Sequence, residues 1–244
     1  MKESFLDHLE ELRKRIIHWF VFCCIATLLT FYFSPKIIEH FFIHIHHKVP
    51  FLILLKPTES LFTRIKISLF IGFLSSLPFL LLQVWEFVSP GLFPSERKFF
   101  SFFLFFSLFL FSAGLLFSWK ILLPWSLNFL TSLLTTHQCP LYSLNAYISF
   151  SLFLLLATGI AFEFPLIIYA LVRLSIIEVN TLRKFQKHAI VLSFILSAVI
   201  TPPDPFTQIL VALPLIILYE ISLLFCLLIS RKHQVLKKKG KLVE

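Results

Sequence analysis

Charged residues are scarce in this chain of 244 residues, at 14%, while 58% of the residues are hydrophobic and the mean hydropathy is +0.89. That composition excludes an ordinary soluble domain and is typical of a polytopic membrane protein. There are only five glycines and no phosphate-binding loop pattern, which argues against a nucleotide-driven pump. No internal repeat is evident, so the inverted-repeat architecture of many secondary transporters finds no support.

The four cysteines predict no disulfide framework, because three of them lie inside apolar runs and only Cys139 falls in a loop. A cleaved signal peptide is not expected either. The first sixteen residues are polar and charged, and the apolar stretch that follows them is long enough to span a bilayer.

Six apolar runs organise the chain. They cover about residues 16–34, 67–87, 99–119, 147–172, 188–200 and 207–229. All but the fifth can cross an apolar core of about 30 Å, whereas the fifth would span only about 20 Å as a helix. It ends at Thr201-Pro202-Pro203-Asp204-Pro205, so the last two helices are predicted to form a short hairpin. A bundle with one short side has a concave face. The sequence thus predicts an all-α membrane domain of six transmembrane helices over residues 1–244.

The distribution of basic residues predicts the orientation. Sixteen of the 22 Lys and Arg residues lie in the N-terminus, in the loops around Arg97 and Arg183, and in the tail over residues 230–244. The positive-inside rule therefore places both termini in the cytoplasm. The net charge of +9 is explained by this topology and by anionic lipid, so no nucleic-acid partner is implied.

Residues 1–16 are predicted to form an amphipathic helix on the cytoplasmic surface. Its apolar stripe consists of Phe5, Leu9, Leu12 and Ile16. Glu11 falls on the opposite face with Arg15 at i+4, so spacing alone favours an ordinary surface ion pair. Glu96 follows the proline-rich turn after Phe87 and stands at the start of the third run, where the helix dipole favours an acid. Together, however, two separated carboxylates can each clamp one guanidinium, and charge-assisted bidentate geometry favours Arg over Lys.

Glu163 is the one charged residue in the apolar run between Tyr147 and Val172. An intramembrane carboxylate normally faces a bundle interior or a wet cavity, which makes it a candidate functional residue. The alternative is a protonated acid that hydrogen-bonds to a neighbouring helix. Glu220 lies deep in the sixth run beside Tyr219 and is expected to bond to the fifth helix or to the surroundings of Glu163.

A histidine cluster and two further acids are interpreted more simply. His40 and His44 stand at helical spacing, with His46 and His47 nearby. Zinc binding would need a cysteine or acid to complete the site, so an external helix with solvent-facing histidines is favoured, and no metal or cofactor is expected. Glu39 and Glu59 are expected to be solvated.

Four segments, in order, resemble the TatC family, the core membrane subunit of the twin-arginine protein translocase. The stretch His8-Leu9-Glu10-Glu11-Leu12-Arg13-Lys14-Arg15 resembles its opening, and Phe87-Val88-Ser89-Pro90-Gly91-Leu92 with Glu96-Arg97 resembles its first cytoplasmic loop. Phe162-Glu163-Phe164-Pro165 resembles its fourth-helix element, and Thr201-Pro202-Pro203-Asp204 through Gln208, with Leu218-Tyr219-Glu220, resembles its last hairpin. The chain departs mildly from the pattern at Lys98, where a second arginine is common.

The resemblance implies a glove-shaped bundle of six helices in the bacterial inner membrane that receives twin-arginine signal peptides of folded cargo and uses the proton gradient. It implies that Glu11 and Glu96 bind the two arginines, with Leu12, Arg13 and Phe87 close by. Glu163 and Gln208 would be intramembrane polar residues that engage TatA- and TatB-type single-span subunits. Pro57 and Asp204 would belong to an extracytoplasmic cap, and the protein would form oligomers.

Two other classes compete with this interpretation. A proton-coupled secondary transporter would use Glu163 as its titrating carboxylate and would move a small solute without partners. An intramembrane enzyme is disfavoured, because no nucleophile–base pair or metal-ligand pattern is legible inside the runs.

Overall fold

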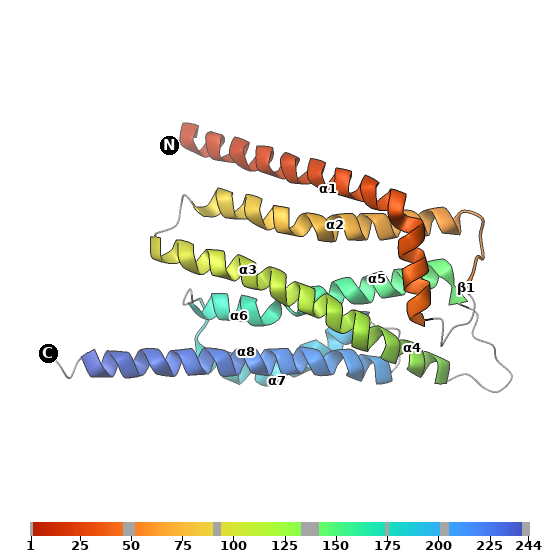
Figure 1. Ribbon diagram of the computed structural model, residues 1–244. Helices are drawn as coiled ribbons and strands as arrows, with labels where there is room; N and C mark the ends of the chain where they lie inside the picture. Colours follow the sequence, from red (N-terminus) through yellow and green to blue (C-terminus); the bar gives the residue numbers. More distant parts are fainter. Residues whose placement is uncertain are drawn as a thin grey trace. The chain divides into compact units, whose positions relative to one another are not determined.

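The computed structural model describes residues 2–45, 52–89, 94–132, 142–173, 176–200 and 205–240 (Figure 1). The elements are α1 (Lys2–Ile45), β1 (Leu52–Ile53), α2 (Glu59–Val88), α3 (Pro94–Phe117), a π-helix (Ser118–Leu122), α4 (Leu123–Ser132), β2 (Tyr142–Ser143), α5 (Leu144–Ala161), α6 (Phe164–Arg173), α7 (Val179–Ile200) and α8 (Pro205–Gly240). Helix dominates, as expected, because an apolar medium leaves backbone groups no partners other than their own chain.

Five helical stretches of the described chain are long and apolar enough to cross a membrane. They are Leu9–Phe41, Glu59–Phe87, Phe100–Ser132, Leu144–Arg173 and Pro205–Leu224. The fifth apolar run lies in α7, which starts earlier than the run, at Val179, and has 22 residues. Arg183, Lys184 and Lys187 occupy its first half, so its apolar part is short, as predicted. The protein is an all-α polytopic membrane protein.

Helix α1 runs without interruption from Lys2 to Ile45. The amphipathic segment predicted over residues 1–16 is therefore the first part of the same helix as the first span. Pro35 lies inside α1, and Figure 1 shows the helix bending in its C-terminal part. A proline removes one backbone donor and crowds the preceding turn, which accounts for the bend.

The chain divides into two compact units. In the first (Met1–Phe109 with Leu130–Phe153), α1 packs against α2. A Cβ atom on Gly72 would lie 2.7 Å from Thr27 Cα, so only glycine permits this approach of α1 to α2. Trp19 Nε1 also donates a hydrogen bond of 3.1 Å to Ser76 Oγ. At one end of the unit, β1 and β2 form a short parallel pair, with Leu52 opposite Tyr142.

The second unit (Leu110–Phe129 with Leu154–Glu244) packs α3 against α5 at two glycines. A Cβ on Gly114 would lie 3.0 Å from Gly159 Cα, and a Cβ on Gly159 would lie 2.9 Å from Phe111 Cε2. The π-helix follows, and the Leu123 N–H bonds to Ser118 O at its end. Pro124, the second residue of α4, has no N–H to donate. Helices α7 and α8 contact each other as a hairpin, as predicted.

Candidate functional site

A charged cluster joins α1 to the last turns of α2. The Arg15 guanidinium lies between two carboxylates: its Nε and Nη2 bond to Glu11 Oε1 at 3.0 and 2.6 Å, and its Nη1 bonds to Glu86 Oε2 at 2.5 Å. Gln83 Oε1 accepts a longer bond of 3.4 Å from Nη1. The i+4 spacing on α1 brings Arg15 to Glu11, whereas the packing of α1 on α2 brings it to Glu86. The predicted ion pair between Glu11 and Arg15 is confirmed, and it extends to a second helix.

The other residues predicted near Glu11 belong to the same two helices. Leu12 is half-buried on α1, and Arg13 is exposed beside it. Phe87 is half-buried on α2, directly after Glu86. One end of α1 and one end of α2 therefore supply all of these side chains.

Glu96 lies in the first turn of α3, where the helix dipole favours an acid, as predicted. Its side chain lies outside the described part of the structure. The next residue, Arg97, donates a hydrogen bond of 2.9 Å from Nη2 to Ser89 O, at the end of α2. This bond ties the start of the Glu96 helix to the end of the helix that carries Glu86 and Phe87.

Glu163 lies at a break in the fourth apolar run. Helix α5 ends at Ala161 and α6 begins at Phe164, and the turn between them is held by the Glu163 N–H donating to Ile160 O over 3.0 Å. Pro165 causes the break, because its nitrogen carries no hydrogen and its ring crowds the preceding turn. Glu163 O then accepts from Leu166 and Ile167 N–H groups, each at 3.0 Å, and starts α6. The side chain is half-buried.

The break packs against the glycine crossing of α3 and α5. The Phe162 ring lies 5.5 Å from that of Phe117, and a Cβ on Gly114 would lie 2.9 Å from Phe162 Cγ. The residue before Glu163 is thus fixed by close packing on α3. We expect this packing to limit the positions that the Glu163 backbone can adopt.

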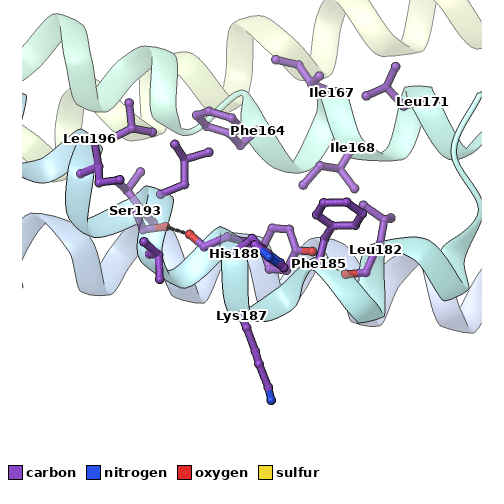
Figure 2. A pocket seen from close by; sticks show the side chains of 16 residues that line it. Phe164, Ile167, Ile168, Leu171, Leu182, Phe185, Lys187, His188, Ser193 and Leu196 are labelled. Carbon is purple, nitrogen blue, oxygen red and sulfur yellow. Dashed lines mark hydrogen bonds between the residues drawn. The ribbon is translucent and has the colours of Figure 1, made fainter.

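An apolar groove of about 770 Å³ lies between α6 and α7, with Leu215 and Tyr219 of α8 adding to its wall (Figure 2). Phe164, the residue after Glu163, is part of the lining. Figure 2 shows Ile168 of α6 directed toward α7, while Lys187 points away from the groove. The groove therefore presents hydrocarbon side chains next to the helix break.

Polar side chains of α8 hold the hairpin with α7. Gln208 Nε2 donates to Phe194 O over 3.0 Å, Tyr219 Oη donates to Leu182 O over 2.7 Å, and Glu220 Oε1 accepts from Gln186 Nε2 over 2.5 Å. Gln208, near the start of α8, bonds toward the end of α7, whereas Tyr219 and Glu220, further along α8, bond near the start of α7, so the two helices are antiparallel. The predicted bond from Glu220 to the fifth helix is confirmed.

The expectation that Glu59 is solvated is wrong. Only 7% of this residue is exposed. Its Oε2 accepts from the N–H groups of Leu55 at 2.6 Å and Lys56 at 3.4 Å, and its Oε1 accepts from the Asn145 N–H at 2.9 Å and from the Ser143 hydroxyl. One carboxylate therefore joins the start of α2 to β2 and the start of α5. Sequence spacing gives no sign of it, because Ser143 of β2 and Asn145 of α5 lie far along the chain.

The remaining predicted residues are placed only in part. Pro57 is exposed in the turn before α2, close to Glu59, whereas Asp204 lies outside the described residues. His40 and His44 belong to α1, so the predicted helix is confirmed there, while His46 and His47 lie outside the described residues. Within the described ranges, no group of three or more metal-binding side chains comes together.

Glu86 is the functional candidate that sequence reasoning misses. Glu86 stands at the end of an apolar run, where an acid is expected to be solvated. Its partner on α1 is 71 positions away, so no local spacing reveals the contact. The one feature of the sequence that could have pointed to Glu86 is that it directly precedes Phe87, a predicted site residue.

Known proteins resemble this chain over nearly its whole length. The family model described as Sec-independent protein translocase protein (TatC) matches residues 7–214. The Sec-independent protein translocase protein TatC of Aquifex aeolicus (strain VF5) is 41% identical over 239 residues, covering 95% of this chain and 98% of that protein. The protein of the same name from Carboxydothermus hydrogenoformans is 34% identical over 231 residues, covering 94% and 95%.

Solved structures agree in fold. A crystal structure of the twin-arginine translocase receptor TatC superimposes with a TM-score of 0.79 at 41% identity and covers 91% of this chain and 99% of that one. A second such structure, in the detergent DDM, gives a TM-score of 0.78. The fold and the matched sequence together define a polytopic membrane component of a protein-translocation system. The chain belongs to the TatC family.

Proposed function

We propose that this protein is the receptor that binds the twin-arginine signal peptide of folded cargo at the cytoplasmic face of the bacterial inner membrane. Glu11 and Glu96 each accept one arginine, and Leu12, Arg13 and Phe87 surround them. The observation that carries this proposal is the way Glu11 holds Arg15. A carboxylate oxygen there already receives two N–H groups of one guanidinium, at 3.0 and 2.6 Å. The position therefore suits an arginine, and not merely a positive charge.

The charge of the chain supports the location and the need for acids. With sixteen of 22 basic residues on one predicted side, both termini are cytoplasmic in this proposal. A basic surface repels a twin-arginine sequence, so local carboxylates are required to create an attractive well. Recognition at this face involves no chemical step, so the protein acts as a receptor and not as an enzyme.

Partner subunits are proposed to engage the second unit. A single-span helix of the TatA or TatB type would bind near Glu163 and Gln208, where the break between α5 and α6 places a half-buried acid beside the apolar groove. One interhelical hydrogen bond in a membrane contributes about 1 kcal/mol, enough to fix the register of a partner whose binding otherwise depends on packing. Assembly of several copies, with Pro57 and Asp204 in an extracytoplasmic cap, and translocation driven by the proton gradient complete the proposal.

The test is peptide binding to the full-length protein in lipid nanodiscs, with an Arg-Arg signal peptide and its Lys-Lys counterpart. We expect tenfold or greater loss for Glu11→Ala, for Glu96→Ala and for the Lys-Lys peptide, because each removes a charge-assisted pair of about 1.5–3 kcal/mol. Glu163→Gln is the contrasting variant, which should bind the peptide normally and lose co-purification with single-span partners. Equal binding in all arms would reject the receptor role, and the Glu163 transporter interpretation would then be tested by solute uptake.

A further inference from the structure

Arg15 occupies the acid to which the signal peptide is proposed to bind. Its guanidinium uses Nε and Nη2 for Glu11 and Nη1 for Glu86, so it bridges α1 and α2. The donors Nε and Nη2 are those that an incoming arginine would also present to Glu11. Both of these contacts are made to Glu11 Oε1, so a peptide arginine that takes the two-donor contact at this oxygen replaces the guanidinium of Arg15 there.

Glu86 offers Arg15 a carboxylate partner after Arg15 has been displaced from Glu11. Its side chain is 60% exposed, and its bond to Arg15 uses Oε2. The bond does not involve Glu11, so Arg15 keeps a carboxylate partner when it leaves that residue. Without Glu86, releasing Glu11 would leave Arg15 with only the weak 3.4 Å contact to Gln83 among the described contacts to α2.

We propose that Arg15 is an internal competitor for the signal-peptide site and that Glu86 is the acceptor that holds Arg15 while a peptide arginine occupies Glu11. This inference rests on the proposed receptor function and adds the regulation of its site. The competitor sets a threshold: a ligand must offer a guanidinium pair better than the one already present. A lysine ammonium is a point charge and competes poorly with a two-donor guanidinium contact, so the exchange sharpens the preference for arginine.

Opposite changes in peptide affinity on removing Arg15 and on removing Glu86 distinguish a competitor from an ion pair that only stabilises the fold. Removing Arg15 takes away the guanidinium that bonds to Glu11 Oε1, so Arg15→Gln should tighten binding of the Arg-Arg peptide. Removing Glu86 drives Arg15 onto Glu11, so Glu86→Gln should weaken it. Each change should be about twofold to fivefold, the range for ion pairs that are partly solvated. In the Arg15→Gln background, Glu86→Gln should have no further effect, because there is no arginine left to hold.

Titrations of the full-length protein in nanodiscs, with Arg-Arg and Lys-Lys peptides, measure these effects. The matched control is Lys14→Gln, since Lys14 is an exposed neighbour whose loss changes the net charge equally. Tighter binding in Arg15→Gln but not in Lys14→Gln, together with the vanishing Glu86 effect in the double variant, supports the proposal. Arg15→Lys, which keeps the charge but loses the two-donor contact, gives a smaller increase in affinity and replaces Arg15→Gln if that variant does not fold.

The outcomes separate the two proposals. If the unchanged protein binds the Arg-Arg peptide through Glu11 but Arg15→Gln binds it equally or more weakly, the competitor is rejected and the receptor function stands. An equal increase in Lys14→Gln also rejects it, because net charge then explains the result. If Glu86→Gln weakens peptide binding equally in the unchanged protein and in the Arg15→Gln variant, Glu86 contacts the peptide itself. Its proposed role as the acceptor of Arg15 is then overturned. If no Glu11-dependent binding is found, both proposals fail.

Discussion

Glu59 and Glu86 lie near the two ends of the same helix, α2, and they bond in opposite ways. Glu59 is 7% exposed and accepts hydrogen bonds from three backbone N–H groups and one hydroxyl. Glu86 is 60% exposed and bonds to the guanidinium of Arg15. The first acid cannot release one partner without disturbing a backbone junction. The second holds its partner through one exposed ion pair, which contributes about 1 kcal/mol or less. An acid that is fully bonded to backbone thus stabilises a structure, whereas an exposed acid that bonds to one side-chain cation can keep that cation while the cation changes its other partner.

The largest expected effect on stability is at Glu59, the buried acid of the two. Glu59→Gln places an amide N–H₂ group against donors and removes the charge that strengthens four hydrogen bonds, so it should lower the melting temperature in nanodiscs by several degrees. Glu39→Gln is the matched control, because Glu39 is an exposed acid of α1. If both variants have the same melting temperature as the unchanged protein, the hydrogen bonds of Glu59 do not stabilise the first unit.

An intermediate effect on stability is expected at Gly72, where α1 and α2 pack closely. Gly72→Ala puts a Cβ against Thr27 at the contact between α1 and α2, and overpacking of this kind costs about 1–3 kcal/mol. Because α1 and α2 carry Arg15 and Glu86, signal-peptide affinity should fall together with stability. The matched change is Gly114→Ala in the second unit, which should destabilise the protein while leaving peptide affinity intact. Equal loss of affinity in both variants would show that the effect is not specific to the α1–α2 pair.

The smallest effect on stability is expected at Glu86 itself. Glu86→Gln removes one exposed ion pair, so unfolding free energy should change by less than about 1 kcal/mol even though peptide binding changes. Thermal melting in nanodiscs beside the peptide titration measures both. A loss of stability as large as that of Glu59→Gln would contradict the comparison and make Glu86 a structural residue.

Local patterns in the sequence predict much of this structure. Hydropathy gives the apolar helices, because each needs about 20 apolar residues to cross the bilayer, and the i+4 rule gives the pair between Glu11 and Arg15. The bond between Glu220 and α7 is also predictable, since a hairpin forces its two helices together. Each of these depends on neighbouring residues or on adjacent elements.

Contacts between distant segments cannot be predicted in the same way. The bonds of Glu59 to Ser143 and Asn145 join residues 84 and 86 positions apart, and the expectation of a solvated acid fails for that reason. Glu86 is missed because its partner is on α1. The break at Glu163 is different: Pro165 marks it in the sequence, but the hydropathy of the run is continuous across it.

That break has a consequence for how the chain enters the bilayer. Helix α5 has 18 residues and α6 has 10, which correspond to about 27 Å and about 15 Å. Neither length exceeds the hydrocarbon thickness of about 30 Å, and α6 falls far short of it. During biosynthesis the two pieces must therefore leave the insertion machinery as a single hydrophobic segment. Pro165 has no N–H to donate, and a helix break of this kind is tolerated in a membrane where neighbouring helices surround it. Maturation of this segment is thus coupled to the arrival of later parts of the chain.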